Sequence, residues 1–291
     1  MLIVTLFLLV ILYFGYQLWL NNRSVDAPSH QLVSASLEKS IRWLMANRDS
    51  ILDVENPMLW WFLKESADIT RDVRLNELFS NYKKRYLDPN PRNVWWHLFD
   101  TNSKAPIAMW QLEHLPDYSL YFIFGVTCDP ALGKEINIRH QNDPALCAYH
   151  HLRSSCVTHQ LMGTRFAQRR NCYISEISNE LVLALQKKIV SQLVWDPRIM
   201  DVYIQRVMML AESGASESIK PVWLQRILDA QLSDGSWGDF YPVIPVGRGY
   251  HVGFVWRGLV VKQSKGDFHA TAQGILLMSL VTSGSHVRLA N

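Results

Sequence analysis

Apolar residues recur at helical spacing through most of this 291-residue chain. Positions four apart lie on one face of an α-helix, so a regular apolar ladder predicts a helix with one buried face. The spacing predicts helices over residues 57–66, 71–87, 104–114, 117–127, 144–153, 157–169, 175–194, 197–212, 217–231 and 268–281. Because most of the segments between them are short, consecutive helices should pair as antiparallel hairpins in an all-α fold.

Three of these helices begin with a capping residue that is followed by proline. The three pairs are Asn56-Pro57, Asp143-Pro144 and Asp196-Pro197. The capping side chain accepts hydrogen bonds from the first free backbone amides, and proline at the next position loses nothing because its missing N–H would be unpaired there. These pairs therefore predict where the three helices start.

Two stretches depart from the helical pattern. Residues 128–141 have the composition of a loop. Residues 240–265 alternate in hydrophobicity and place β-branched side chains around glycines, which predicts a small β-hairpin insertion in the helical fold.

The first 22 residues carry no charged side chain. A run of about twenty apolar residues is long enough for a helix to cross a bilayer. No Lys or Arg precedes the run, unlike in a cleaved signal peptide. We therefore expect a transmembrane anchor over residues 1–22, a linker over 23–30 and one domain over 31–291. The protein would then be a single-pass membrane protein that binds the membrane through its N-terminal helix.

The side of the membrane on which the domain lies rests on two opposing signals. Arg23, Lys39 and Arg42 follow the span, which favours a cytoplasmic domain. An anchor at the N-terminus commonly serves as an export signal, and on this basis we favour an extracytoplasmic domain.

Charge argues against a nucleic-acid-binding protein. The formal net charge is +3, and charged residues of both signs are interspersed and make up 19% of the chain. A nucleic-acid-binding surface needs a basic patch, and no basic block of that type occurs. A small-molecule, lipid or glycan ligand and a protein partner stay open.

Two segments near the C-terminus resemble a known superfamily. Gln231, Gly235 and Trp237, in ILDAQLSDGSWGDF, resemble the glutamine–tryptophan motif of triterpene cyclases. In this pattern the glutamine can cap helix ends, the glycine makes a turn with positive φ, and the tryptophan packs over the next helix. GDFHATAQGILLMSL at residues 266–280 is similar to an inner-helix start in protein prenyltransferase β subunits.

The resemblance implies an α/α toroid over residues 31–291, and in the prenyltransferases the histidine that matches His269 is a zinc ligand. The Asp-x-Asp-Asp and Asp-Asp-x-x-Asp motifs of the cyclases and the Asp-x-Cys pair of the prenyltransferases do not occur. The resemblance therefore implies the fold more strongly than the chemistry.

A similarity between two segments of the chain, which we call the internal echo, supports the toroid interpretation. Residues 156–166 and 267–277 each place a histidine near a helix start, with a glycine four or five residues later. Inner-helix N-termini surround the central cavity of an α/α toroid. His159 and His269 are therefore expected to face each other across that cavity.

The segment CAYHHLRSSCVTHQLMG at residues 147–163 permits several interpretations. Two Cys-x2-His pairs hold the ligand types of a structural zinc site. Four cysteines also permit up to two disulfides in an exported domain. The cysteines are Cys128, Cys147, Cys156 and Cys172.

Two further interpretations stay open for the same residues. An open catalytic or zinc site would combine His159 and His269 with Cys156 or Asp267. Buried thiols and hydrogen-bonded histidines would serve packing alone.

Two functions from different classes follow from these observations. The first is a membrane-anchored enzyme that acts on a lipid-linked, prenyl or saccharide substrate, with His159, His269 and Asp267 as its catalytic groups. The second is a non-catalytic module that binds a partner protein or a glycan at the membrane. A cavity with convergent polar groups would favour the enzyme, whereas an apolar, filled centre would favour the module.

Overall fold

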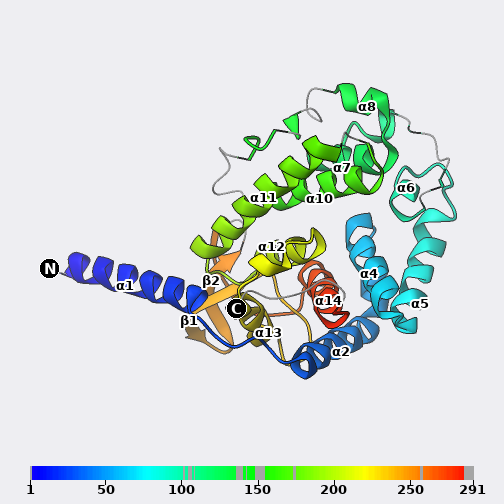
Figure 1. Ribbon diagram of the computed structural model, residues 1–291. Helices are drawn as coiled ribbons and strands as arrows, with labels where there is room; N and C mark the ends of the chain where they lie inside the picture. Colours follow the sequence, from blue (N-terminus) through cyan, green and yellow to red (C-terminus); the bar gives the residue numbers. More distant parts are fainter. Residues whose placement is uncertain are drawn as a thin grey trace. The chain divides into compact units, whose positions relative to one another are not determined.

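A computed structural model describes residues 2–100, 102–103, 107, 109–135, 140–141, 143–147, 155–172, 175–255 and 258–284 (Figure 1). Helices dominate these ranges. The helices are α1 (Leu2–Asn22), α2 (His30–Ala46), α3 (Arg48–Ile51), α4 (Pro57–Thr70), α5 (Val73–Tyr82), η1 (Lys83–Leu87), α6 (Trp96–Phe99), η2 (Met109–Gln111), α7 (Asp117–Thr127), α8 (Pro130–Lys134), α10 (Cys156–Arg169), α11 (Ser175–Trp195), α12 (Asp201–Glu212), η3 (Ser216–Ser218), α13 (Pro221–Asp229) and α14 (Phe268–Thr282). The strands are β1 (Tyr241–Gly247), β2 (Tyr250–Val255) and β3 (Gly258–Gln263).

The chain divides into two compact units. The first unit combines residues 1–40 with residues 190–291, and the second comprises residues 41–189. The prediction of one toroid domain over residues 31–291 concerns how all the helices are arranged together, and it stays a prediction.

The core of the first unit contains α12 and α14. Both helices are buried over most of their length, and α14 is buried from Ala270 to Ser279. Gly274 lies against the ring of Trp237, where a Cβ atom would come within 2.5 Å of the ring. A residue with a side chain could therefore not replace this glycine without displacing Trp237.

The end of α1 is built into the first unit by polar contacts. Asn21 is fully buried, and its side-chain amide donates to the carbonyl oxygen of Leu193 at 2.6 Å. The hydroxyl of Tyr203 donates to Asn21 Oδ1 at 2.8 Å, and Trp223 Nε1 donates to the Asn21 carbonyl oxygen at 2.9 Å. These bonds fix the last turn of α1 to three other parts of the chain.

Within the described ranges, no helix is both long enough and apolar enough to cross a membrane. The prediction of a transmembrane anchor over residues 1–22, with the membrane as partner and a single-pass location, is therefore wrong. The sequence showed that Gln17, Asn21 and Asn22 are uncharged, but not that all three form hydrogen bonds inside the folded unit.

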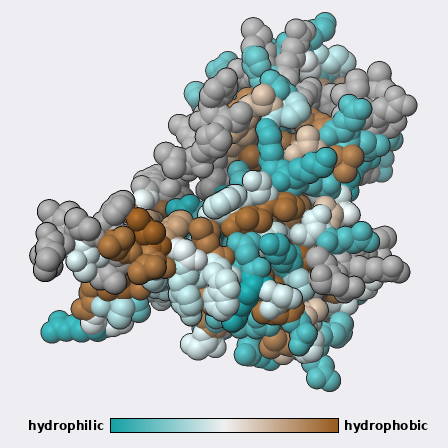
Figure 2. Space-filling model, turned by 60° about the vertical axis from the view of Figure 1, so that its left-hand side comes forward, coloured by the Kyte–Doolittle hydropathy of each residue, from teal (hydrophilic) through white to brown (hydrophobic). Residues whose placement is uncertain are grey.

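Other side chains of α1 are exposed. In Figure 2, hydrophobic residues gather on the left-hand side of the molecule, where α1 lies. The exposed apolar residues of this helix include Leu8, Ile11, Leu12, Phe14 and Trp19. A contiguous apolar face of this kind is typical of a contact surface.

The predicted β insertion is present, but it has three strands rather than two. The order is β1-β2-β3, and both pairs are antiparallel. Gly253 in β2 is buried, and a Cβ atom there would lie 2.2 Å from the carbonyl oxygen of Tyr241. Glycine at this position therefore lets β1 and Phe240 approach the strand closely.

The described regular structure of the second unit consists of helices, which turns and loops connect. Helices α7 and α10 pack closely because Gly125 and Gly163 lie at their contact. A Cβ atom on Gly163 would lie 2.1 Å from the ring of Tyr121, and one on Gly125 would lie 2.8 Å from the carbonyl oxygen of Gly163. Gly163 follows His159 in the sequence as Gly274 follows His269, so both glycines of the internal echo serve close packing.

Most of the predicted helices are present. Helix α7 has the predicted bounds, and the cap at Asn56 is confirmed because its Oδ1 accepts from the Met58 amide at 3.1 Å. The predicted helix over 71–87 instead starts at Val73 after the cap Asp72, and its last turn is the π-helix η1. The predicted helices over 104–114 and 144–153 lie partly outside the described residues, and their described parts are the short helix η2 and a turn.

The prediction of a helix start at Pro197 is wrong, because α12 starts at Asp201. Asp196 does not cap a helix. Its carboxylate instead binds the guanidinium groups of Arg198 and Arg206. Asp196 Oδ1 also accepts from the Arg198 backbone amide at 3.4 Å, but residues 197–200 do not continue into a helix.

Candidate functional site

The turn after α13 has the conformation that its sequence predicted. Gly235 has φ +98°, a region that favours glycine, and a Cβ atom there would lie 2.4 Å from the Lys39 carbonyl oxygen. Trp237 is buried, and its Nε1 donates to the Ile227 carbonyl oxygen at 2.8 Å. The side-chain amide of Gln231 donates to the carbonyl oxygens of Ser36 and Gly235, each at 2.9 Å. The glutamine therefore ties the turn to α2.

A pocket of about 290 Å³ lies beside this turn in the first unit. Its walls come from the loop before α12, from α12, from the end of α13 and from the start of β1. Most of the lining side chains are apolar or aromatic, and the polar ones are Asp229, Gln231 and Ser264. The apolar and aromatic residues are Ile199, Ile204, Ala230, Leu232, Trp237, Phe240, Tyr241 and Pro242. Ligand sites are typically concave and mostly apolar with few polar groups, and the volume lies at the small end of their range.

A charged cluster lies in the loop that contributes Ile199 to the pocket. Asp196 Oδ1 accepts from Arg198 Nε at 2.6 Å, and Asp196 Oδ2 accepts from Arg206 Nη1 at 3.0 Å. Burial by itself raises the pKa of the Asp196 carboxyl, but the hydrogen bonds and charges of the two arginines outweigh burial and hold this pKa below its usual range. Asp196 is therefore ionised at neutral pH.

His269 is held between two helices of the first unit. Its Nδ1 lies 3.2 Å from Asp201 Oδ2 on α12, and its Nε2 lies 3.0 Å from Gln273 Nε2 on α14. An Nδ1–H tautomer satisfies both contacts, since it donates to the carboxylate and accepts from the amide. A carboxylate on one ring nitrogen is the arrangement of a general base, but the other nitrogen is already hydrogen-bonded to Gln273.

Asp267, a catalytic candidate in the sequence, has a structural role in the first unit. It caps α14, because its Oδ1 accepts from the Ala270 amide at 2.9 Å. The carboxylate that holds the His269 ring belongs to Asp201. Sequence reasoning missed Asp201 and Gln273, although Gln273 lies one helical turn after His269 and is visible as an (i, i+4) neighbour.

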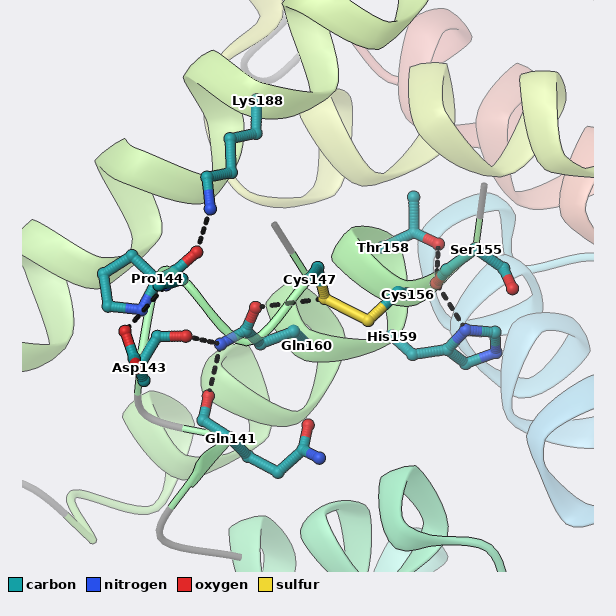
Figure 3. The surroundings of a disulfide bond; sticks show 11 residues. Gln141, Asp143, Pro144, Cys147, Ser155, Cys156, Thr158, His159, Gln160 and Lys188 are labelled. Carbon is teal, nitrogen blue, oxygen red and sulfur yellow. Dashed lines mark hydrogen bonds between the residues drawn. A yellow bond between two sulfur atoms is a disulfide. The ribbon is translucent and has the colours of Figure 1, made fainter. Parts of the chain in front are cut away.

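Cys147 and Cys156 form a disulfide beside α10 (Figure 3). Next to it the buried amide of Gln160 donates to the carbonyl oxygens of Gln141 at 2.6 Å and Asp143 at 2.7 Å. Lys188 binds the carbonyl oxygen of Pro144 in the same region. Covalent and hydrogen bonds therefore hold this segment onto α10 and α11.

His159 lies at the start of α10 in the second unit. Its Nδ1 lies 2.6 Å from the Ser155 carbonyl oxygen, and its ring packs at a tilt of 35° against the Tyr118 ring, with a centroid separation of 4.5 Å. These contacts give the ring a packing role. His159 and His269 belong to different units, so their expected opposition across a cavity stays a prediction.

The metal prediction is wrong. No group of three or more His, Cys, Asp or Glu side chains gathers closely enough to hold a metal ion in the part of the chain that the structure describes. Cys156 is in a disulfide and offers no thiolate, and His159 and His269 each bind protein groups. His150 and His151, the other histidines of the segment at residues 147–163, lie outside the described residues.

The second disulfide joins Cys128 to Cys172. All four cysteines are therefore paired. Disulfides persist in extracytoplasmic compartments and are rare in a reducing cytosol. The pairing supports the extracytoplasmic location that the sequence favoured.

Sequence reasoning also missed the arginines of the first unit, although one signal was present. Arg206 stands in VYIQRVMML, where apolar residues surround it on every helical face. A charged side chain in such a context must be buried with a partner.

Comparison of the chain with models of known protein families, with curated proteins and with solved structures found no match.

Proposed function

We propose that this chain is a disulfide-stabilised binding protein of an oxidising compartment, and that its first unit binds a small, mainly apolar ligand in the pocket beside the turn at residues 231–237. The observation that carries the proposal is the lining of that pocket. Ile199, Ile204, Leu232 and Pro242 line it together with three aromatic residues. Such walls exclude water and favour hydrocarbon.

A saccharide fits this lining less well. A sugar needs many hydrogen-bond partners, and two of the three polar side chains of the lining already bind protein groups. Gln231 donates to two backbone carbonyls, and Asp229 Oδ1 accepts from Gln225 at 2.7 Å. A short prenyl or other hydrocarbon chain needs none of these bonds.

Binding without catalysis accounts best for the two histidines. Neither His159 nor His269 lines the pocket, and each ring is hydrogen-bonded to protein groups. The resemblance to the α/α-toroid superfamily supports the same class of ligand, because enzymes of that superfamily act on prenyl chains.

Isothermal titration calorimetry tests the proposal with two probes, geraniol as a short prenyl alcohol and N-acetylglucosamine as a saccharide. We expect geraniol to bind with a Kd on the order of 100 µM and the saccharide not to bind. Binding of geraniol should have a negative heat-capacity change, which marks burial of apolar surface.

A pair of alanine variants provides the control. Ala230 lines the pocket, so Ala230→Phe should fill it and abolish the geraniol signal. Ala215 is equally half-buried in the same unit but does not line the pocket, so Ala215→Phe should bind geraniol as the natural chain does. Equal binding by both variants, or tighter binding of the saccharide, would contradict the proposal.

A further inference from the structure

Three arginines of the first unit bind two consecutive residues, Asp196 and Pro197. Arg198 and Arg206 bind Asp196, and Arg226 Nη2 donates to the carbonyl oxygen of the adjacent Pro197 at 2.8 Å. The Arg206 side chain is only 2% exposed. Among the described residues, Asp196 is the one carboxylate in a salt bridge with any of these arginines, so the cluster has two more positive than negative charges.

Two donors of this cluster have no partner. The Nε atoms of Arg206 and Arg226 are buried and have no hydrogen-bond partner among the described residues. A buried charge whose donors are unpaired is costly, whereas the same donors bind an oxyanion strongly. The cluster therefore has the composition of an oxyanion site.

The three arginines are not among the residues that line the pocket, but the cluster and the pocket are formed by the same segments. Ile199 and Ile204 line the pocket and flank the arginines of the loop and of α12 in sequence. Arg226 lies one helical turn before Asp229 and Ala230, which line the pocket at the end of α13. Its guanidinium also lies beside the hydroxyls of Tyr203 and Tyr241, of which Tyr241 lines the pocket.

We propose that the ligand of this pocket is a single-chain amphiphile, with its hydrocarbon chain against the apolar walls and its oxyanionic end, a carboxylate or a phosphate, bound by Arg226 and Arg206. This inference rests on the proposed function and adds the polar end of the ligand to it. Arginine suits the role because its planar group pairs with either oxyanion through two hydrogen bonds.

Calorimetry with four probes tests the inference: octanol, octanoate, octyl phosphate and inorganic phosphate. In the natural chain, we expect one or both charged amphiphiles to bind at least about tenfold more tightly than octanol, since hydrogen bonds to charged groups are the strong ones. Inorganic phosphate should bind more weakly than octyl phosphate, because it has no chain to bury.

Arg226→Gln provides the decisive variant. It should remove the preference for the charged probes, measured within the variant as the ratio of their affinities to that of octanol. Arg23→Gln is the matched control, because Arg23 is an exposed arginine of the same unit and lies outside the cluster. Arg226→Lys keeps the charge without the paired donors and should restore only part of the preference.

Each remaining outcome is decisive. If octanol binds as tightly as both charged amphiphiles, the arginines only hold the loop before α12, and this inference fails while the proposed function stands. If inorganic phosphate binds as tightly as octyl phosphate, the ligand is a free oxyanion and the amphiphile is excluded. If no probe with a chain binds, both proposals fail. Preference for octanoate or for octyl phosphate identifies the head group.

Discussion

The turn at residues 231–237 and the segment at residues 141–160 are held in place by different means. In the turn, the backbone of Gly235 and the ring of Trp237 fix the conformation. In the segment, the Cys147–Cys156 disulfide and the amide of Gln160 hold Gln141, Asp143 and Cys147 against α10. Tight packing requires particular residues, whereas a cross-link requires only two cysteines that meet.

The largest effect is expected from Trp237→Ala. Trp237 is 1% exposed and packs on Gly274, so the substitution leaves a cavity and should lower the free energy of unfolding by about 4 kcal/mol. Urea unfolding measures this. Trp195 is 69% exposed, and Trp195→Ala should change stability by less than about 0.5 kcal/mol. Similar losses in both variants would show that packing does not hold the turn.

Removal of the disulfides tests the other region. In the chain-entropy model, a disulfide raises the free energy of unfolding by an amount that grows with the length of the loop it closes. The increase is about 4 kcal/mol for Cys128–Cys172, which are 44 residues apart, and about 2.5 kcal/mol for Cys147–Cys156, which are 9 residues apart. Replacing both cysteines of one disulfide by serine should lower the free energy of unfolding, measured in urea, and the loss should be larger for the Cys128–Cys172 pair. The reverse order would mean that contacts around Gln160 depend on the shorter cross-link.

Asp196→Asn should lower the free energy of unfolding by about 3 kcal/mol at neutral pH, because it leaves buried Arg206 without its carboxylate partner. The pKa of Asp196 is lowered in the folded state, so its contribution is complete above its unfolded pKa and is lost as pH falls through the folded one. The natural chain and the variant should therefore differ less in their free energy of unfolding below about pH 4, which urea unfolding at a series of pH values measures. A difference that is constant with pH would exclude this ion pair as its source.

Gly235→Ala and Gly214→Ala separate backbone strain from steric clash. Both glycines have positive φ, but a Cβ atom meets Lys39 only at Gly235, and nothing lies within 4 Å of it at Gly214. We expect the free energy of unfolding to fall by about 1 kcal/mol in Gly214→Ala and by about 2 kcal/mol more in Gly235→Ala. Thermal unfolding compares them, and equal losses would mean that α2 moves to admit the methyl group.

The smallest effect is expected from His159→Phe. The substitution keeps an aromatic ring against Tyr118 and removes one hydrogen bond to Ser155, which should lower the free energy of unfolding by about 1 kcal/mol or less. Geraniol binding should not change. Loss of binding in a variant that remains folded would assign His159 a function and would break the contrast between the two regions.

The parts of the fold and site that the sequence predicted depend on neighbouring residues. The bounds of α7, the cap at Asn56 and the turn at Gly235 follow from side chains and backbone within a few positions of one another. The β insertion was placed correctly, but its strand number was not, because alternation locates strands without showing how they pair.

The uncharged run at residues 1–22 shows where such reasoning fails. A helix there was predicted and is present, yet its last residues form bonds to Leu193, Tyr203 and Trp223. The pocket was also invisible in the sequence, since its walls come from residues 199 to 264 and only the turn had a recognisable pattern.

The sequence by itself determined that this chain is mostly helical, where most of its helices run and which conformation the turn at Gly235 adopts. Only the tertiary structure decided the partners of the polar groups: Asp201 for His269, the two arginines for Asp196, and Cys147 for Cys156. The physical reason is range. Apolar periodicity and backbone preference act between near neighbours, whereas His269 and Asp201 are 68 residues apart and meet only when α12 packs against α14.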